Sequence, residues 1–133
     1  MSTAPVFEAK ARNGDKIRTA SSIIFVEDVL ATLLWYQDTL GLQVEFAWGD
    51  PVVHGSIIAG ASTFHFSRAD PTEPRSSYLT LYVNELDELY EDVTARGAEV
   101  VQPPETMEWG MRAFMIHDCN GDLLMFADPS SGE

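Results

Sequence analysis

The sequence predicts an α+β domain built from two tandem βαβββ modules. Three observations lead to this fold class: a strand–helix–strand motif occurs twice, a glycine follows each helical stretch, and a turn dipeptide divides the segments after each copy. A chain of 133 residues has the length of one domain with its own apolar core. We expect the modules at 20–68 and 77–128, joined by a linker at 69–76. The remaining residues form an N-terminal extension, 1–19, and a C-terminal tail, 129–133.

The repeat is clearest when the two strand–helix–strand copies are set side by side. An acidic residue, Asp28 or Glu85, precedes each helix and places negative charge at the positive end of the helix dipole. Gly41 and Gly97 supply the left-handed conformation in which a helix ends without steric strain. The first copy comprises a strand at 21–28, a helix at 29–40 and a strand at 42–48, and the second comprises 78–85, 86–96 and 98–102.

Local patterns support the helices and add two hairpins. Each helix carries an apolar stripe at helical spacing, namely Val29, Leu33, Tyr36 and Leu40 in the first and Leu86, Leu89, Tyr90 and Val93 in the second. Each module then ends in a hairpin, because extended segments flank a turn dipeptide. These hairpins pair 52–59 with 62–66 around Gly60-Ala61, and 112–117 with 123–126 around Asn120-Gly121.

The chain is strongly acidic, with 21 acidic residues against 8 basic ones and a net charge of −13. Such a surface repels the phosphates of nucleic acids and anionic membranes, so we expect neither as a partner. It attracts cations. The acidity serves solubility alone or gathers a cationic ligand, and the sequence leaves both interpretations open.

Other features indicate a soluble cytoplasmic protein without a nucleophilic cysteine. Cys119 is the only cysteine, which excludes an intrachain disulfide and fits a reducing compartment. Asp118 beside it should raise the pKa of the thiol and make it a poor nucleophile. The first twenty residues lack the apolar core of a secretory signal, and no segment approaches the roughly 18 apolar residues of a membrane span.

Two local motifs resemble one protein superfamily. An acidic strand end, Val26-Glu27-Asp28, leads to Trp35-Tyr36-Gln37-Asp38-Thr39-Leu40-Gly41, and later Trp109-Gly110-Met111-Arg112 precedes Asp118-Cys119-Asn120-Gly121-Asp122-Leu123-Leu124. In this order, and with the repeat, they resemble the vicinal-oxygen-chelate superfamily of glyoxalases, bleomycin-resistance proteins and extradiol dioxygenases. The similarity is greatest to the bleomycin-resistance branch. The resemblance implies curved mixed sheets that form a cleft with helices outside, and a homodimer that often completes the cleft.

Metal-using members of that superfamily place His, Glu or Gln at four positions facing the cleft. By the same motifs these positions are Ser21, His65, Tyr78 and Met125 in this chain. Ser and Tyr are poor ligands unless deprotonated, a thioether suits soft Cu(I), and a single imidazole does not hold a metal against water. We therefore expect no metal and no cofactor.

Because metal-ligating residues are absent from these positions, the predicted cleft is lined mainly by aromatic and methionine side chains. Strand alternation places Phe25, Tyr78 and Tyr82 on the faces that the resemblance assigns to the cleft. Such residues either pack in the core or stack against a flat ligand, and a cluster of them favours stacking with cation–π contacts. The candidate ligand-binding residues are Phe25, Trp48, His65, Tyr78, Tyr82, Trp109, Met111 and Met125.

No catalytic residue is assigned, because no acid–base pair or nucleophile motif is present in the sequence. The sequence therefore predicts a protein that binds a small molecule without a metal, and the specific hypothesis is sequestration of a planar cationic antibiotic. Two alternatives remain. One is an enzyme on the same fold, either of glyoxalase or dioxygenase type or a metal-free lyase or isomerase. The other is an accessory or regulatory interaction protein.

Overall fold

The computed structural model describes residues 12–13, 16, 21–70 and 77–132. The predicted N-terminal extension, 1–19, lies almost entirely outside them, as do 71–76 of the predicted linker. Module A contains β1 (Ser22–Val26), α1 (Val29–Asp38), β2 (Gln43–Trp48), β3 (His54–Ala59) and β4 (Ser62–Arg68). Module B contains β5 (Tyr78–Tyr82), α2 (Leu86–Ala95), β6 (Glu99–Thr106), β7 (Arg112–His117) and β8 (Leu123–Asp128), followed by the 3-10 helix η2 (Pro129–Gly132).

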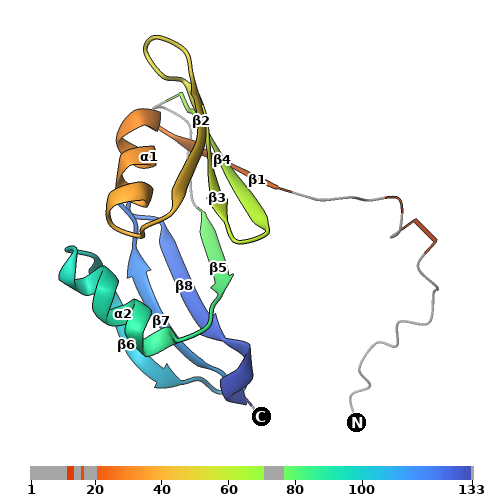
Figure 1. The fold of residues 1–133 in the computed structure, drawn as a ribbon, viewed down its shortest axis with the longest axis vertical. Coiled ribbons are helices and arrows are strands. Elements are labelled where there is room, and N and C mark those ends of the chain that lie inside the picture. The colour runs from red at the N-terminus through yellow and green to blue at the C-terminus, as the bar shows by residue number, and fades with distance from the viewer. Residues whose placement is uncertain (1–11, 14–15, 17–20, 71–76, 133) are drawn as a thin grey trace.

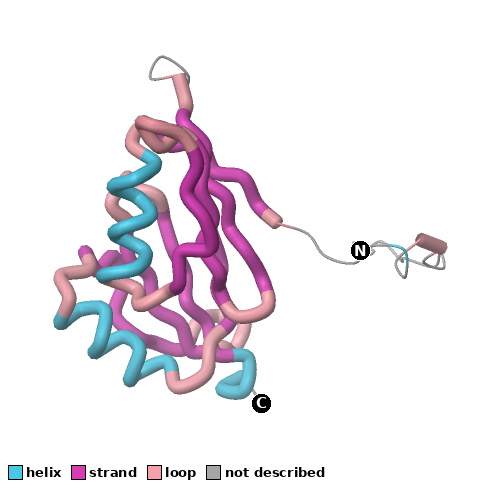
Figure 2. The backbone as a smooth tube through the Cα atoms, turned by 45° about the horizontal axis from the view of Figure 1, so that its top comes forward, coloured by secondary structure: helices cyan, strands magenta, loops and turns pink. Residues whose placement is uncertain are grey.

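Each module forms one mixed four-stranded sheet, and the predicted fold class is confirmed. The strand orders are β1-β4-β3-β2 and β5-β8-β7-β6, so the two modules share one topology. The first strand of each module pairs in parallel with the last, and the other pairings are antiparallel. Figure 1 shows α1 beside the first sheet and α2 beside the second, and in the turned view of Figure 2 both helices again lie on the same side of the molecule.

The helix ends follow the sequence signals, with one exception. The Asp28 carboxylate accepts a hydrogen bond from the backbone N–H of Ala31 at 2.9 Å and caps α1. Gly41 and Gly97 have positive φ angles of 70° and 93°, as expected after a helix. Glu85 precedes α2 but has a φ of 53° and makes no side-chain capping bond. Its charge lies near the start of α2 without the hydrogen bond that Asp28 makes.

One core joins both modules. Its buried residues include Phe66 and Leu33 from module A together with Phe114 and Leu124 from module B. The Tyr36 hydroxyl on α1 donates a buried hydrogen bond of 2.8 Å to Asp118, which follows β7. Burial of apolar surface common to both modules makes them one packing unit. Within the described part of the chain, no helix has the length and apolarity needed to cross a membrane.

The strands alternate between this core and solvent. In β1, Ile24 and Val26 are buried, whereas Ile23 and Phe25 are 58% and 55% exposed. In β4, Phe64 and Phe66 are likewise buried while their neighbours are partly exposed, because successive side chains point to opposite faces of a sheet. Each sheet therefore has a core face toward its helix and an opposite face, which we call the open face.

Candidate functional site

The open face of module A is a grid of aromatic, histidine and serine side chains. Gly55 and Ile57 of β3 face α1: a Cβ on Gly55 would meet Leu33 at 2.5 Å, and Ile57 lies in the core. His54 and Ser56, which alternate with them along β3, consequently face the other way. Strand register then sets two rows across the sheet, Ile23–His65–Ser56–Phe46 and Phe25–Ser67–His54–Trp48.

Two histidines contact each other at the centre of this grid. His54 Nε2 lies 3.2 Å from His65 Nδ1, and His54 Nδ1 lies 2.5 Å from Ser67 Oγ. The Phe46 ring packs against both imidazoles, with centroid distances of 5.6 Å to His54 and 5.8 Å to His65. These contacts fix the orientation of both imidazoles on a surface that remains partly exposed.

The open face of module B is richer in methionine. Its three rows are Tyr78–Leu123–His117–Glu99, Thr80–Met125–Met115–Gln102 and Tyr82–Ala127–Ala113–Glu105. Ala113, Met125 and Ala127 form a small second cluster of buried residues, against which Met107, Met111 and Met115 pack. Unbranched thioether side chains adapt to the shape of a ligand at low cost, so this surface suits a flat apolar molecule.

Two polar groups are directed at the methionine sulfurs. The Tyr78 hydroxyl lies 3.5 Å from Met125 Sδ, and the Gln102 amide nitrogen lies 3.1 Å from Met107 Sδ. Sulfur is a weak hydrogen-bond acceptor. Both donors are therefore available to a stronger acceptor on a bound molecule.

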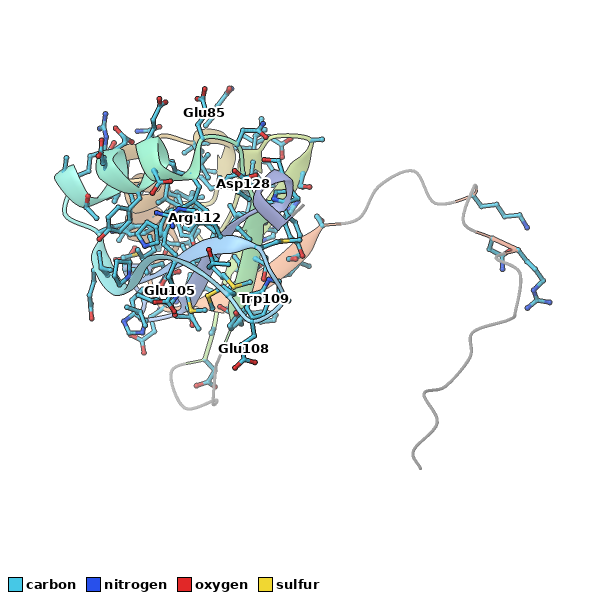
Figure 3. All side chains as sticks on the ribbon, turned by 90° about the horizontal axis from the view of Figure 1, so that it is seen from below. Glu85, Glu105, Glu108, Trp109, Arg112 and Asp128 are labelled. Atoms are coloured by element: carbon cyan, nitrogen blue, oxygen red, sulfur yellow. The ribbon has the colours of Figure 1, made fainter. Side chains whose placement is uncertain are left out.

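Two carboxylates lie near the exposed Trp109 at one end of module B. Glu105 is the last residue of the row that begins with Tyr82, and Glu108 and Trp109 follow in the β6–β7 turn. Figure 3 shows Glu105, Glu108 and Trp109 together at this end of the molecule. The nearby cation Arg112 pairs with Asp87 at 2.8 Å and leaves this end of the open face acidic.

The predicted ligand-binding residues divide into two groups. Phe25, Trp48 and His65 lie on the open face of module A. The module B group comprises Tyr78, Tyr82, Trp109, Met111 and Met125. Among the described residues, no hydrogen bond or ring contact joins one group to the other. Tyr82 also lines a pocket with residues 59–62 of module A, and Phe25 lines one with Cys119 and Asn120 of module B.

His54 was not predicted as a functional residue, but it is the direct partner of His65 in the structure. The signal was present, because a two-residue turn at Gly60-Ala61 pairs Ala59 with Ser62 and fixes every later pair of the hairpin. No group of three or more His, Cys, Asp or Glu side chains in the described segments is placed to hold a metal ion.

Cys119 is a weak nucleophile in the structure, although the main reason differs from the predicted one. Burial raises the pKa of its thiol to about 11, and the Asp118 carboxylate adds a smaller upward effect. Thiolate is the reactive form, so little of it exists near neutral pH. The sequence reasoning named only the Asp118 charge.

Comparisons with known proteins define the family. The model of the Glyoxalase/Bleomycin resistance protein/Dioxygenase superfamily matches residues 17–132, and the chain belongs to that superfamily. The predicted resemblance is thereby confirmed. A search of curated proteins finds no match.

Solved structures support the same fold at low sequence identity. TioX from Micromonospora sp. ML1 has a TM-score of 0.75 and 20% identity, over 84% of this chain and 98% of that protein. The bleomycin resistance determinant encoded on the transposon Tn5 has a TM-score of 0.70 and 20% identity, with the same coverage. A bleomycin-binding protein complexed with bleomycin has a TM-score of 0.68 and 20% identity, again with 84% and 98% coverage. At this identity they show similarity of fold.

Proposed function

We propose that this protein binds a planar, cationic aromatic small molecule without chemical change, and that sequestration of an antibiotic is its role. The observation that carries the proposal is the exposure of large aromatic side chains on the open faces. Trp48 and Tyr82 are 67% exposed, and the others are Trp109 at 56%, Phe25 at 55% and Tyr78 at 54%. Exposed apolar surface of this kind marks a binding site rather than a core.

Electrostatics favour a cation. The net charge of −13 and the carboxylates of Glu105 and Glu108 beside Trp109 create a negative potential where a ligand would stack. Aromatic faces also attract cations through their quadrupole. The bleomycin-resistance and bleomycin-binding proteins of the same fold give this proposal its antibiotic class.

We further propose that two chains complete the site. A ligand pocket usually encloses most of its ligand, whereas Phe25, Trp48, Tyr78 and Tyr82 of the open faces are exposed to solvent in one chain. A second copy that covers these faces would bury the aromatic residues and bring a module A face opposite a module B face. Such pairing would place the two groups of candidate residues around one enclosed ligand.

Ligand titration tests the binding proposal. Proflavine, a planar cation, is expected to bind saturably with quenching of tryptophan fluorescence, and bleomycin is the corresponding antibiotic probe. Added salt should weaken binding without abolishing it, because exposed charges are screened beyond about 8–10 Å whereas stacking persists. Trp109→Ala should weaken binding by about 1–3 kcal/mol, the range for loss of a large aromatic contact.

The matched control is Trp35→Phe, which changes a tryptophan on α1 that packs against the core. It should lower the fluorescence signal and leave affinity measured by calorimetry unchanged. An anionic ring of similar size, naphthalene-2-sulfonate, should bind much more weakly than proflavine. Equal binding of the two would show that the acidity serves solubility alone, and an absence of saturable binding by proflavine and bleomycin would refute the proposal.

The assembly proposal predicts a homodimer with twice the 14.7 kDa chain mass. Light scattering coupled to size exclusion measures this directly. Phe25→Glu should shift the population toward monomer, because it places a charge on the exposed apolar part of the open face. A wild-type chain that stays monomeric at high micromolar concentration would contradict the proposal and confine any site to one chain.

A further inference from the structure

We propose that the open face of module A contains a hydrogen-bonding subsite ending at His65 Nε2, and that it selects aromatic heterocycles bearing an edge N–H or amino group. The inference rests on the proposed function, since it concerns the same open faces. It adds a chemical requirement that stacking and charge do not impose. The subsite consists of Ser56, His65, His54 and Ser67.

The contacts among these residues form a chain with one free end. Ser67 Oγ meets His54 Nδ1, and His54 Nε2 meets His65 Nδ1. A neutral imidazole has one donor and one acceptor nitrogen, so the state of one ring sets the state of the next. If Ser67 donates to His54, then His54 donates to His65 and His65 Nε2 carries a proton. If the chain runs the other way, His65 Nε2 is an acceptor.

His65 Nε2 is the end of the chain that a ligand can reach. Within the described segments no protein group bonds to it, and its ring is only partly buried on the open face. The two nitrogens of an imidazole diverge, so Nε2 points away from His54. Because the chain can run from His65 toward Ser67, this nitrogen can act as an acceptor, which is the role that an amino or ring N–H group of a cationic ligand requires.

A buried hydroxyl lies opposite His65 in the strand register. Ser56 is opposite His65 in the strand register and is fully buried, and its Oγ has no hydrogen-bond partner among the described residues. A buried hydroxyl without a partner costs free energy, and such groups deserve a functional explanation. Ser56 lies between Phe46 and His65 in its row. A polar ligand atom would reach this hydroxyl only after a covering side chain moves, and would then supply its missing partner.

The surroundings define the class of ligand. The polar centre is bordered by Phe46 and Trp48 on one side and by Ile23 and Phe25 on the other. A flat ring lies against such a border, and its edge substituent then meets the polar centre. A site with prepared polar groups discriminates against an analogue that leaves them unpaired. The ligand class is therefore a planar heteroaromatic cation with an amino or ring N–H group.

Two dyes with the same ring system and charge test this requirement. Proflavine carries amino groups at its edge, whereas 10-methylacridinium carries none. We expect the full-length protein to bind proflavine about tenfold more tightly, the factor for one hydrogen bond of about 1.4 kcal/mol. His65→Leu should remove this preference by weakening proflavine alone. The matched control is His117→Leu, which removes a histidine from the open face of module B and should keep the preference.

An imidazole nitrogen spectrum gives a readout that does not depend on substitution. Proflavine should shift the His65 nitrogen resonances of the wild-type protein toward a single tautomer, and 10-methylacridinium should not. Equal affinities for the two dyes, or equal weakening of both by His65→Leu with no shift in the nitrogen spectrum, would overturn the subsite alone. Failure of both dyes to bind would overturn the proposed function and the subsite with it.

Discussion

Phe114→Ala is expected to lower the free energy of unfolding by about 3–5 kcal/mol while leaving one cooperative transition, which is the usual cost of deleting a buried phenylalanine. Phe114 is fully buried in β7 and stacks on Phe126 of β8, with ring centroids 4.7 Å apart and planes inclined by 9°. It also meets the edge of Tyr90 on α2 at 5.2 Å. The residue thus connects both strands of the hairpin to the helix that covers them.

Urea denaturation followed by circular dichroism and by tryptophan fluorescence measures this effect. The two signals should coincide, because the core is continuous from module A to module B and the chain should unfold as one domain. Leu30→Ala is the control, since Leu30 is 48% exposed on α1 and its truncation should cost under about 1 kcal/mol. Two separate transitions in the Phe114 variant would show that the modules are independent domains.

The order of the elements was predictable because the relevant signals are local. Gly41 and Gly97 end helices through their own backbone conformation, and a two-residue turn at Gly60-Ala61 sets the register of its hairpin. The alternation in β1 and β5 likewise depends only on neighbouring residues. A sequence that contains the same local signals twice leaves little doubt about its topology.

The features that were not predictable arise from packing between distant residues. β6 extends to Thr106, beyond its predicted end at 102, although it contains Pro103 and Pro104. It is an edge strand, where a missing N–H is tolerated, and its register with β7 shifts twice in this region. No local pattern in the sequence indicates how such an edge strand continues.

The candidate site was likewise predictable where local signals determine it and not where distant residues pack together. Alternation assigned Phe25, Tyr78 and Tyr82 to open faces, because a strand fixes the side of each residue from its neighbours. Whether an open face is covered depends on surfaces distant in the sequence, which no strand pattern encodes. The turn at Gly60-Ala61 fixes the register that brings His54 near His65, but the distance of 3.2 Å between their ring nitrogens also depends on side-chain packing.

The contact between Tyr36 and Asp118 joins residues that are distant in the sequence. Asp118→Ala is expected to lower the free energy of unfolding by about 3 kcal/mol. The Asp118 carboxylate accepts the Tyr36 hydroxyl at 2.8 Å and the backbone N–H groups of Asn120 and Asp122 at 2.8 and 2.9 Å. Its removal leaves a buried hydroxyl without a partner and loosens the β7–β8 turn. Adding Tyr36→Phe to the Asp118→Ala variant should raise its free energy of unfolding by about 1–2 kcal/mol, because the unpartnered hydroxyl is then absent.

The pH dependence gives this prediction a second, independent measurement. Burial raises the pKa of Asp118 above its ordinary value, against smaller downward effects from its hydrogen bonds to Tyr36 and to the backbone. An acid with a raised pKa in the folded state holds its proton more tightly there than in the unfolded state, so it stabilises the fold at low pH. This contribution is complete below the unfolded pKa and is lost as pH rises through the folded pKa. Relative to Asp118→Asn, which has no charge to titrate, the wild type should therefore gain stability as pH falls from 7 toward 4. Chemical denaturation at each pH measures the difference, and a wild type that instead loses stability relative to the variant would show that its hydrogen bonds outweigh its burial.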